Sequence, residues 1–179
     1  QFSSLDHVSK GRIGWNIVTT WSVLAAQNFG DHHQISHADR YIRAEEYLAV
    51  AKALWDSWSD DSIVDDRAAG LYARRESIRP VDHSGEYYSV AGPLNVPRCP
   101  QGRPVLVQAG SSDTGRDFAA RHAEAVFTAH LEMKTAVDFY KDLKSRAKVH
   151  GRDPCSVIIL PGFSPIIAGT EAEAKKAAQ

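Results

Sequence analysis

The sequence predicts an α/β fold in which helices cover a parallel β-sheet. In the second half of the chain, short apolar runs alternate with helix-like segments. These runs are almost continuously apolar, which is typical of a parallel sheet covered by helices. The composition, 43% hydrophobic and 24% charged over 179 residues, is ordinary for a globular protein. We expect about four strands, which could form a doubly wound sheet or part of a (β/α)8 barrel; periodicity alone does not distinguish the two.

The first strand and the first long helix lie in the first third of the chain. Residues 11–20 are entered through glycine and end in β-branched residues, which predicts a buried strand. Ser36 and Asp39 have capping-box spacing and start a helix. Its apolar residues recur in steps of three and four, which places them on one stripe: Tyr41, Ala44, Leu48, Ala51, Trp55 and Trp58.

Residues 62–103 differ in composition from the rest of the chain. They contain four of the chain's eight prolines and several glycines, with short aromatic runs between them. This pattern predicts an irregular excursion with room for one hairpin, and not a strand–helix repeat.

Regular alternation resumes after residue 103. The expected elements are strands at 104–109, 125–128 and 157–160, and helices from the 110–112 turn to about 122, over 134–149 and from 170 to 176.

Charge and composition exclude several classes of partner. The net charge of −1 and the pI of about 6.8 provide no basic field for nucleic acid. No apolar run approaches the roughly 20 residues that span a bilayer, and the first residues lack a signal-peptide pattern. Cys99 and Cys155 form no C-x-x-C pair, which indicates reduced thiols and a cytoplasmic protein.

Three segments, in chain order, resemble one enzyme family. They are the strand at 11–20, the helix start at 37–47 and the long run at 92–120. The resemblance is to nitrilotriacetate monooxygenase component A and the dibenzothiophene-sulfone monooxygenases, bacterial luciferase-like enzymes that depend on FMNH2. It implies that the four strands are part of a (β/α)8 TIM barrel.

The resemblance also implies a reaction and its partners. FMN would arrive as FMNH2 from a separate NADH:FMN oxidoreductase, and O2 would be the co-substrate. One oxygen atom would enter a small organic substrate through a peroxyflavin, and the protein could be a homo-oligomer. No general acid or base is identified. The alternatives are a non-catalytic flavin-binding remnant or truncated paralogue, and a sugar-phosphate-binding α/β domain.

A complete barrel is longer than this chain. It needs eight strands and typically about 250 residues. In addition, the chain opens on Gln1, and its only methionine is Met133. We therefore expect residues 1–179 to be an internal segment of one luciferase-like barrel domain, with 62–103 as an insertion within it.

Ser111 and Ser112 are the first candidates for binding the FMN phosphate. They follow a strand and open a helix, where free N–H groups and hydroxyls favour a phosphate. Alternatively, Ser112 only caps the helix. The resemblance favours Ser111, because the family binds the FMN phosphate with a serine at this turn.

His37 and Tyr41 are four residues apart and share one face of a helix. An imidazole beside a phenol can hold a phosphate or a ribityl hydroxyl. A surface histidine and a core tyrosine are the alternatives. The family places flavin-contacting residues at both positions, so the resemblance implies that His37 and Tyr41 contact the flavin.

Asn16 and Thr20 lie near the end of the first strand, which in a barrel faces the active-site mouth. We assign them to the substrate or flavin pocket; Asn16 could instead be a buried amide. No metal site is expected, because His33 and His37 lack the H-E-x-x-H pattern and the acidic residues lack EF-hand spacing.

Overall fold

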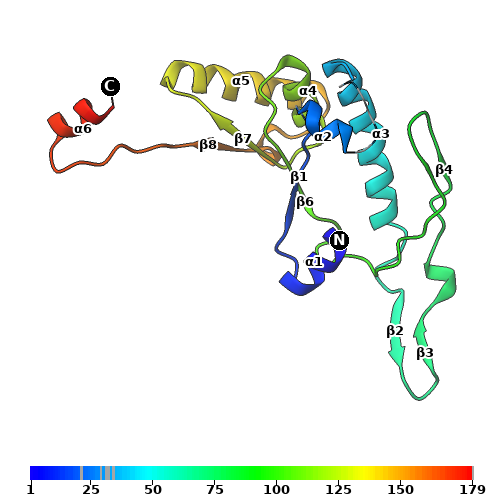
Figure 1. Ribbon diagram of the computed structural model, residues 1–179. Helices are drawn as coiled ribbons and strands as arrows, with labels where there is room; N and C mark the ends of the chain where they lie inside the picture. Colours follow the sequence, from blue (N-terminus) through cyan, green and yellow to red (C-terminus); the bar gives the residue numbers. More distant parts are fainter. Residues whose placement is uncertain (21, 29, 31–32, 34, 179) are drawn as a thin grey trace.

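A four-stranded parallel sheet forms the centre of the molecule (Figure 1). The computed structural model describes residues 1–179 except 21, 29, 31–32, 34 and 179. The sheet order is β1-β6-β7-β8, which confirms the expected four parallel strands. Their bounds are Gly14–Asn16, Val105–Gln108, Ala125–Ala129 and Ile158–Gly162.

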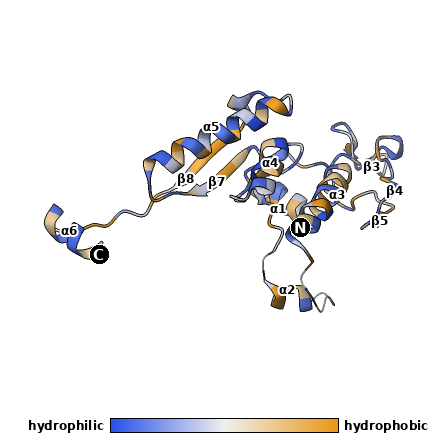
Figure 2. Ribbon diagram, turned by 90° about the horizontal axis from the view of Figure 1, so that it is seen from above, coloured by the Kyte–Doolittle hydropathy of each residue, from blue (hydrophilic) through white to orange (hydrophobic). Residues whose placement is uncertain are grey.

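Helices α3, α4 and α5 pack against one face of this sheet. They span His37–Trp55, Asp113–His122 and Met133–Val149, close to the predicted ranges. The Ser36 Oγ accepts the Asp39 N–H at 3.1 Å, which confirms the predicted start of α3. Between α5 and the sheet, Val126, Phe139 and Leu143 belong to one buried cluster. Figure 2 shows the apolar strands β7 and β8 beneath α5.

The opposite face of the sheet is open. Phe127 is 47% exposed, Ile158 59% and Leu160 48%, although all three are apolar. The first strand is also shorter than the predicted 11–20, and Asn16 on it is exposed. Successive side chains point to opposite faces of a strand, and the helices of this chain cover only one of them.

Two helices at the amino-terminal end were not predicted. They are α1 (Phe2–Ser9) and α2 (Val23–Gln27). The α1 residue Asp6 is fully buried and accepts the side-chain N–H of Gln101 at 2.7 Å. The same amide group donates to the Ile13 carbonyl at 2.8 Å. Helix α1 is therefore tied to a distant segment, which local patterns do not reveal.

The excursion at 62–103 contains two hairpins where one was expected. Strands β2 (Ile63–Asp66) and β3 (Leu71–Ala73) form the first, and β4 (His83–Ser84) and β5 (Ser89–Val90) the second. A short 3-10 helix, η1 (Arg75–Ser77), separates them, and another, η2 (Pro154–Ser156), precedes β8. The role of the excursion as an insertion in a barrel stays a prediction.

Helix α3 ends earlier than its apolar stripe suggested. Trp58 lies beyond the helix, and its Nε1–H donates to the Leu94 carbonyl at 2.7 Å. The Ser57 hydroxyl accepts the Leu94 N–H at 3.1 Å. The end of the stripe thus binds the excursion and does not continue the helix. The last helix, α6 (Glu171–Ala177), lies near its predicted range on an arm that extends away from the sheet (Figure 1).

A carboxylate on α3 holds the second hairpin in place. Glu46 Oε2 accepts the Tyr87 N–H at 2.9 Å, and Oε1 accepts the Tyr88 N–H at 2.9 Å. Oε1 also lies 2.9 Å from Nε2 of His83. The hydrogen bond from His83 and those from the two amides lower the pKa of Glu46 below its ordinary value of 4.5, against the opposing effect of burial.

Glu46→Gln is expected to loosen this hairpin, because a neutral amide has one acceptor oxygen in place of two. Hydrogen exchange at the Tyr87 and Tyr88 amides should become several-fold faster at fixed pH. Because the pKa of Glu46 is lowered in the folded state, its carboxylate stabilises the fold at pH values above its unfolded pKa. This stabilisation is lost as the pH falls through the folded pKa of Glu46. Glu45→Gln, at the neighbouring position, should leave both amides unchanged; equal exchange in the two variants would contradict the assignment.

Candidate functional site

A pocket of about 380 Å³ opens at the carboxyl ends of β1 and β6. It lies between the β6–α4 turn, the segment after β1 and the first turns of α3. Its lining residues are Ile17, Val18, Thr19, Thr20, His37, Arg40, Tyr41, Gln108, Ala109, Gly110, Ser111 and Ser112. Five of the six residues predicted for the site therefore line one pocket, although they come from three separate segments. Ligands in parallel α/β sheets bind at this edge.

Ser112 has the capping role that was the alternative to phosphate binding. Its Oγ accepts the Gly115 N–H at 3.1 Å and begins helix α4. The same Oγ lies 3.3 Å from Nε2 of His37. Ser112 thus joins the start of α4 to the start of α3, while Ser111, one residue earlier, is exposed at the pocket.

Tyr41 is both a core aromatic residue and a pocket residue. Its side chain is only 7% exposed, and its ring lies 5.1 Å from His37 and 5.6 Å from Phe118, centroid to centroid. Its hydroxyl reaches the β6–α4 turn: a Cβ added at Gly110 would lie 2.8 Å from this oxygen, and one at Gly115 2.7 Å. Glycine at both positions permits this close approach.

The turn is also supported from the end of β6. The Gln108 side chain is 2% exposed, and its Oε1 accepts the Gly110 N–H. Nothing in the sequence singled out this residue, because it looks like an ordinary strand position. Other residues of the pocket wall come from the segment after β1 and from α3, which are far away in the sequence.

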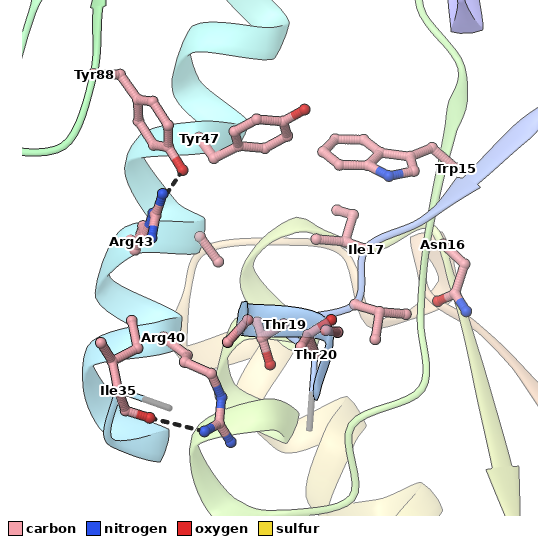
Figure 3. A pocket seen from close by; sticks show the side chains of 14 residues that line it. Trp15, Asn16, Ile17, Thr19, Thr20, Ile35, Arg40, Arg43, Tyr47 and Tyr88 are labelled. Carbon is pink, nitrogen blue, oxygen red and sulfur yellow. Dashed lines mark hydrogen bonds between the residues drawn. The ribbon is translucent and has the colours of Figure 1, made fainter. Parts of the chain in front are cut away.

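Asn16 and Thr20 line a second pocket of about 470 Å³ that adjoins the first (Figure 3). Asn16 is exposed, so its alternative as a buried amide is wrong. Thr20 lines both pockets and adopts a φ of 49°, the left-handed region that β-branched residues avoid. Such strain costs about 1–3 kcal/mol and tends to occur at functional sites. Tyr47 and Tyr88 form an aromatic wall of the second pocket.

Arg40 was also missed as a site residue. It lines both pockets, and its Nη1 donates to the Ile35 carbonyl at 3.0 Å. Its position three residues after His37, on the same helix face, was the available signal.

Clusters of metal-ligating side chains and membrane-spanning helices are both absent from the part of the chain that the structure describes. Within it, no group of three or more His, Cys, Asp or Glu could hold a metal ion, and no helix is long and apolar enough to cross a membrane. Asp31 and His32, which precede His33 in the sequence, lie outside this described part. Asp60 and Asp61 form ion pairs with Arg98 and Arg74.

Fold and site together narrow the class of protein. A parallel sheet of strand–helix units with a pocket at its carboxyl edge occurs in (β/α)8 barrels and in doubly wound sheets. The family model described as "Luciferase-like monooxygenase" matches residues 1–179, and the chain belongs to this family. Its sheet and helices are part of the luciferase-like TIM barrel, as the resemblance implied.

Individual relatives agree with this assignment. The chain is 48% identical over 174 residues to nitrilotriacetate monooxygenase component A of Aminobacter aminovorans, and the match covers 97% of the chain and 38% of the relative. It is 47% identical over 175 residues to N-acetyl-S-(2-succino)cysteine monooxygenase of Bacillus subtilis (strain 168), with coverage of 98% and 40%. The solved structure of a riboflavin lyase with modified FMN and riboflavin superimposes with a TM-score of 0.92 at 37% identity, with coverage of 98% and 39%. The chain thus spans about two fifths of the length of these relatives.

Proposed function

We propose that the protein containing this chain is an FMNH2-dependent, two-component monooxygenase that inserts one oxygen atom of O2 into a small organic substrate. A separate NADH:FMN oxidoreductase supplies the reduced flavin in the cytoplasm. The observation that carries the proposal is the pocket shared by His37, Tyr41 and Ser111 at the carboxyl edge of the sheet. Two relatives support it, since one is named as component A of a monooxygenase and the riboflavin lyase holds a modified FMN.

The residues of the pocket fit the phosphate of FMN. The start of α4 presents backbone N–H groups and the positive end of a helix dipole. The Ser111 and Tyr41 hydroxyls and the His37 imidazole can each donate a hydrogen bond to a phosphate oxygen. Glycines at 110 and 115 keep the turn open enough for the tyrosine hydroxyl to reach it.

These contacts give the flavin and the protein different roles. When bound, reduced FMN supplies the chemistry by which O2 is activated. The residues of this chain hold the phosphate and thereby fix where the flavin lies. Asn16 and Thr20 border the adjoining pocket, where they are placed to contact the flavin or the organic substrate. No side chain here is assigned as a general acid or base.

Tyr41→Phe and Ser111→Ala are each expected to weaken FMN binding by about 10-fold or more. Each removes one hydrogen bond to a charged group, which is worth about 1.5–3 kcal/mol. The measurement is a fluorescence titration of the full-length protein with FMN. Tyr140→Phe on the exposed side of α5 is the matched control and should not change the affinity.

Two outcomes would count against the proposal. Undiminished FMN affinity in both variants would refute the site. FMN binding without substrate-dependent oxygen consumption by the wild-type protein would favour a non-catalytic flavin-binding remnant.

A further inference from the structure

The second pocket, of about 470 Å³, has one aromatic wall that three separate segments build. Tyr88 comes from the hairpin of β4 and β5, and Tyr47 comes from α3; their ring centroids lie 5.5 Å apart in an edge-to-face arrangement. The Tyr47 ring also lies 5.8 Å from the ring of Trp15 on β1, again edge to face. Figure 3 shows the three rings in a row along one side of the pocket.

The rest of the lining indicates the kind of molecule that fits this wall. Small and branched apolar side chains form much of it: Ile17, Val18, Ala25, Ala26, Ile35 and Ala44. A volume of this size is typical of sites for small organic molecules. Aromatic rings have a negative face and a positive edge, so this wall attracts another aromatic ring more strongly than a saturated ring of the same size. Asn16 and Thr19 can hydrogen-bond a polar substituent on such a ring.

Tyr88 is held in this wall at three points. Its N–H donates to Oε1 of Glu46 at 2.9 Å, and its hydroxyl accepts the Nε–H of Arg43 at 3.0 Å. Its ring contacts Tyr47. Of these partners, Arg43 and Tyr47 line the pocket themselves, whereas Glu46 does not.

Glu46 nevertheless fixes where the hairpin lies on α3. Its carboxylate also accepts the Tyr87 N–H and contacts His83, each at 2.9 Å. The turn of the hairpin is shaped to receive this carboxylate, because a Cβ added at Gly85 would collide with Glu46 Oε1. The side chain of Glu46 is only 15% exposed. A residue outside the pocket therefore determines the position of one of its walls.

We propose that the second pocket binds an aromatic compound against Tyr47 and Tyr88, and that Glu46 is a positioning residue that places Tyr88 for this contact. This inference rests on the proposed function and names a substrate class for it. Glu46 acts through the hairpin, so its loss affects the second pocket and leaves FMN binding at the first pocket unchanged. The competing explanation is that Glu46 only stabilises the fold, in which case binding at both pockets would weaken together.

The ligand class is tested by calorimetric titration of the full-length protein with 2-naphthol and with its saturated analogue, decahydro-2-naphthol. Wild type should bind 2-naphthol about 2- to 10-fold more tightly, which is the range expected for an aromatic contact. Tyr88→Leu should lose most of this preference. Tyr140→Leu, at an exposed tyrosine on α5 outside the pocket, is the matched control and should keep it. Equal affinities of wild type for the two compounds, or a full preference in Tyr88→Leu, would overturn the inference.

The positioning role is tested with Glu46→Gln, which keeps only one of the two acceptor oxygens. It should weaken 2-naphthol binding about 2- to 10-fold and FMN binding less than about 2-fold. Glu45→Gln, at the neighbouring position, should change neither. In the Tyr88→Leu background, Glu46→Gln should have no further effect on 2-naphthol, since Glu46 acts through Tyr88.

The outcomes separate this inference from the proposed function. Equal losses of 2-naphthol and FMN affinity in Glu46→Gln, or the same loss of 2-naphthol affinity in both backgrounds, would overturn the positioning role. A wild-type protein that binds FMN but not 2-naphthol would overturn the inference and leave the proposed function intact. A wild-type protein that does not bind FMN would overturn the proposed function.

Discussion

Gly115→Ala is expected to weaken FMN binding about 10- to 100-fold and to lower the free energy of unfolding by about 1–2 kcal/mol. The added Cβ would lie 2.7 Å from the Tyr41 hydroxyl, 3.0 Å from Ser112 Oγ and 3.1 Å from the Gly110 Cα. The last of these is backbone and cannot rotate away. Alanine would gain about 1 kcal/mol of helix propensity, but overpacking of this kind costs typically 1–3 kcal/mol, so the steric effect dominates.

The double variant Tyr41→Phe with Gly115→Ala tests the cause of this loss. Removal of the tyrosine hydroxyl relieves the shortest contact, so the stability cost of Gly115→Ala should be smaller in the Tyr41→Phe background. The measurement is a double-mutant cycle by urea unfolding, with FMN titration on the same samples. Full FMN affinity in Gly115→Ala would show that the β6–α4 turn does not belong to the flavin site.

Leu143→Ala is expected to lower the free energy of unfolding by about 2–5 kcal/mol. Leu143 on α5 is 0% exposed and packs in the cluster formed with Phe139, Val126 and Val157. Truncation removes the transfer free energy of the buried methyl groups and leaves a cavity between the helix and the sheet. The effect is large because the packing of α5 on β7 and β8 depends on this cluster.

Leu131→Ala is the matched control for this prediction. Leu131 is fully exposed between β7 and α5, so the same chemical change should alter the free energy of unfolding by less than about 0.5 kcal/mol. Urea midpoints for the two variants of the full-length protein, at an unchanged slope, give the comparison. Similar midpoints would mean that α5 does not pack on the sheet as described.

Local sequence patterns predicted the elements whose stability is local. The start of α3 follows from Ser36 and Asp39, whose hydrogen bond forms within one helical turn. The parallel strands followed from their apolar runs. Helix α1 could not be predicted in this way, because Asp6 is held by Gln101, 95 residues away in the sequence.

Apolar composition alone also could not show which face of each strand is covered. Val126 and Phe127 are adjacent and both apolar, yet the first is buried against the helices and the second lies on the open face. The face of a strand that is buried depends on which helices pack against the sheet. A run of apolar residues does not reveal this.

The candidate site was predictable where the family motifs mark it and unpredictable where the packing creates it. His37, Tyr41 and Ser111 were chosen from the resemblance, and the structure brings them to one pocket. Gln108 is recognised as a site residue only when α3, β6 and the segment after β1 meet. Arg40 is three residues after His37, but the sequence does not show that its side chain lines both pockets.

The most direct test of the flavin site is a crystal structure of the full-length protein with FMN. We predict phosphate oxygens at about 3 Å from the Ser111 and Tyr41 hydroxyls, at the start of α4. A phosphate bound elsewhere, with these two hydroxyls facing solvent or other side chains, would contradict the assignment of this pocket to the flavin.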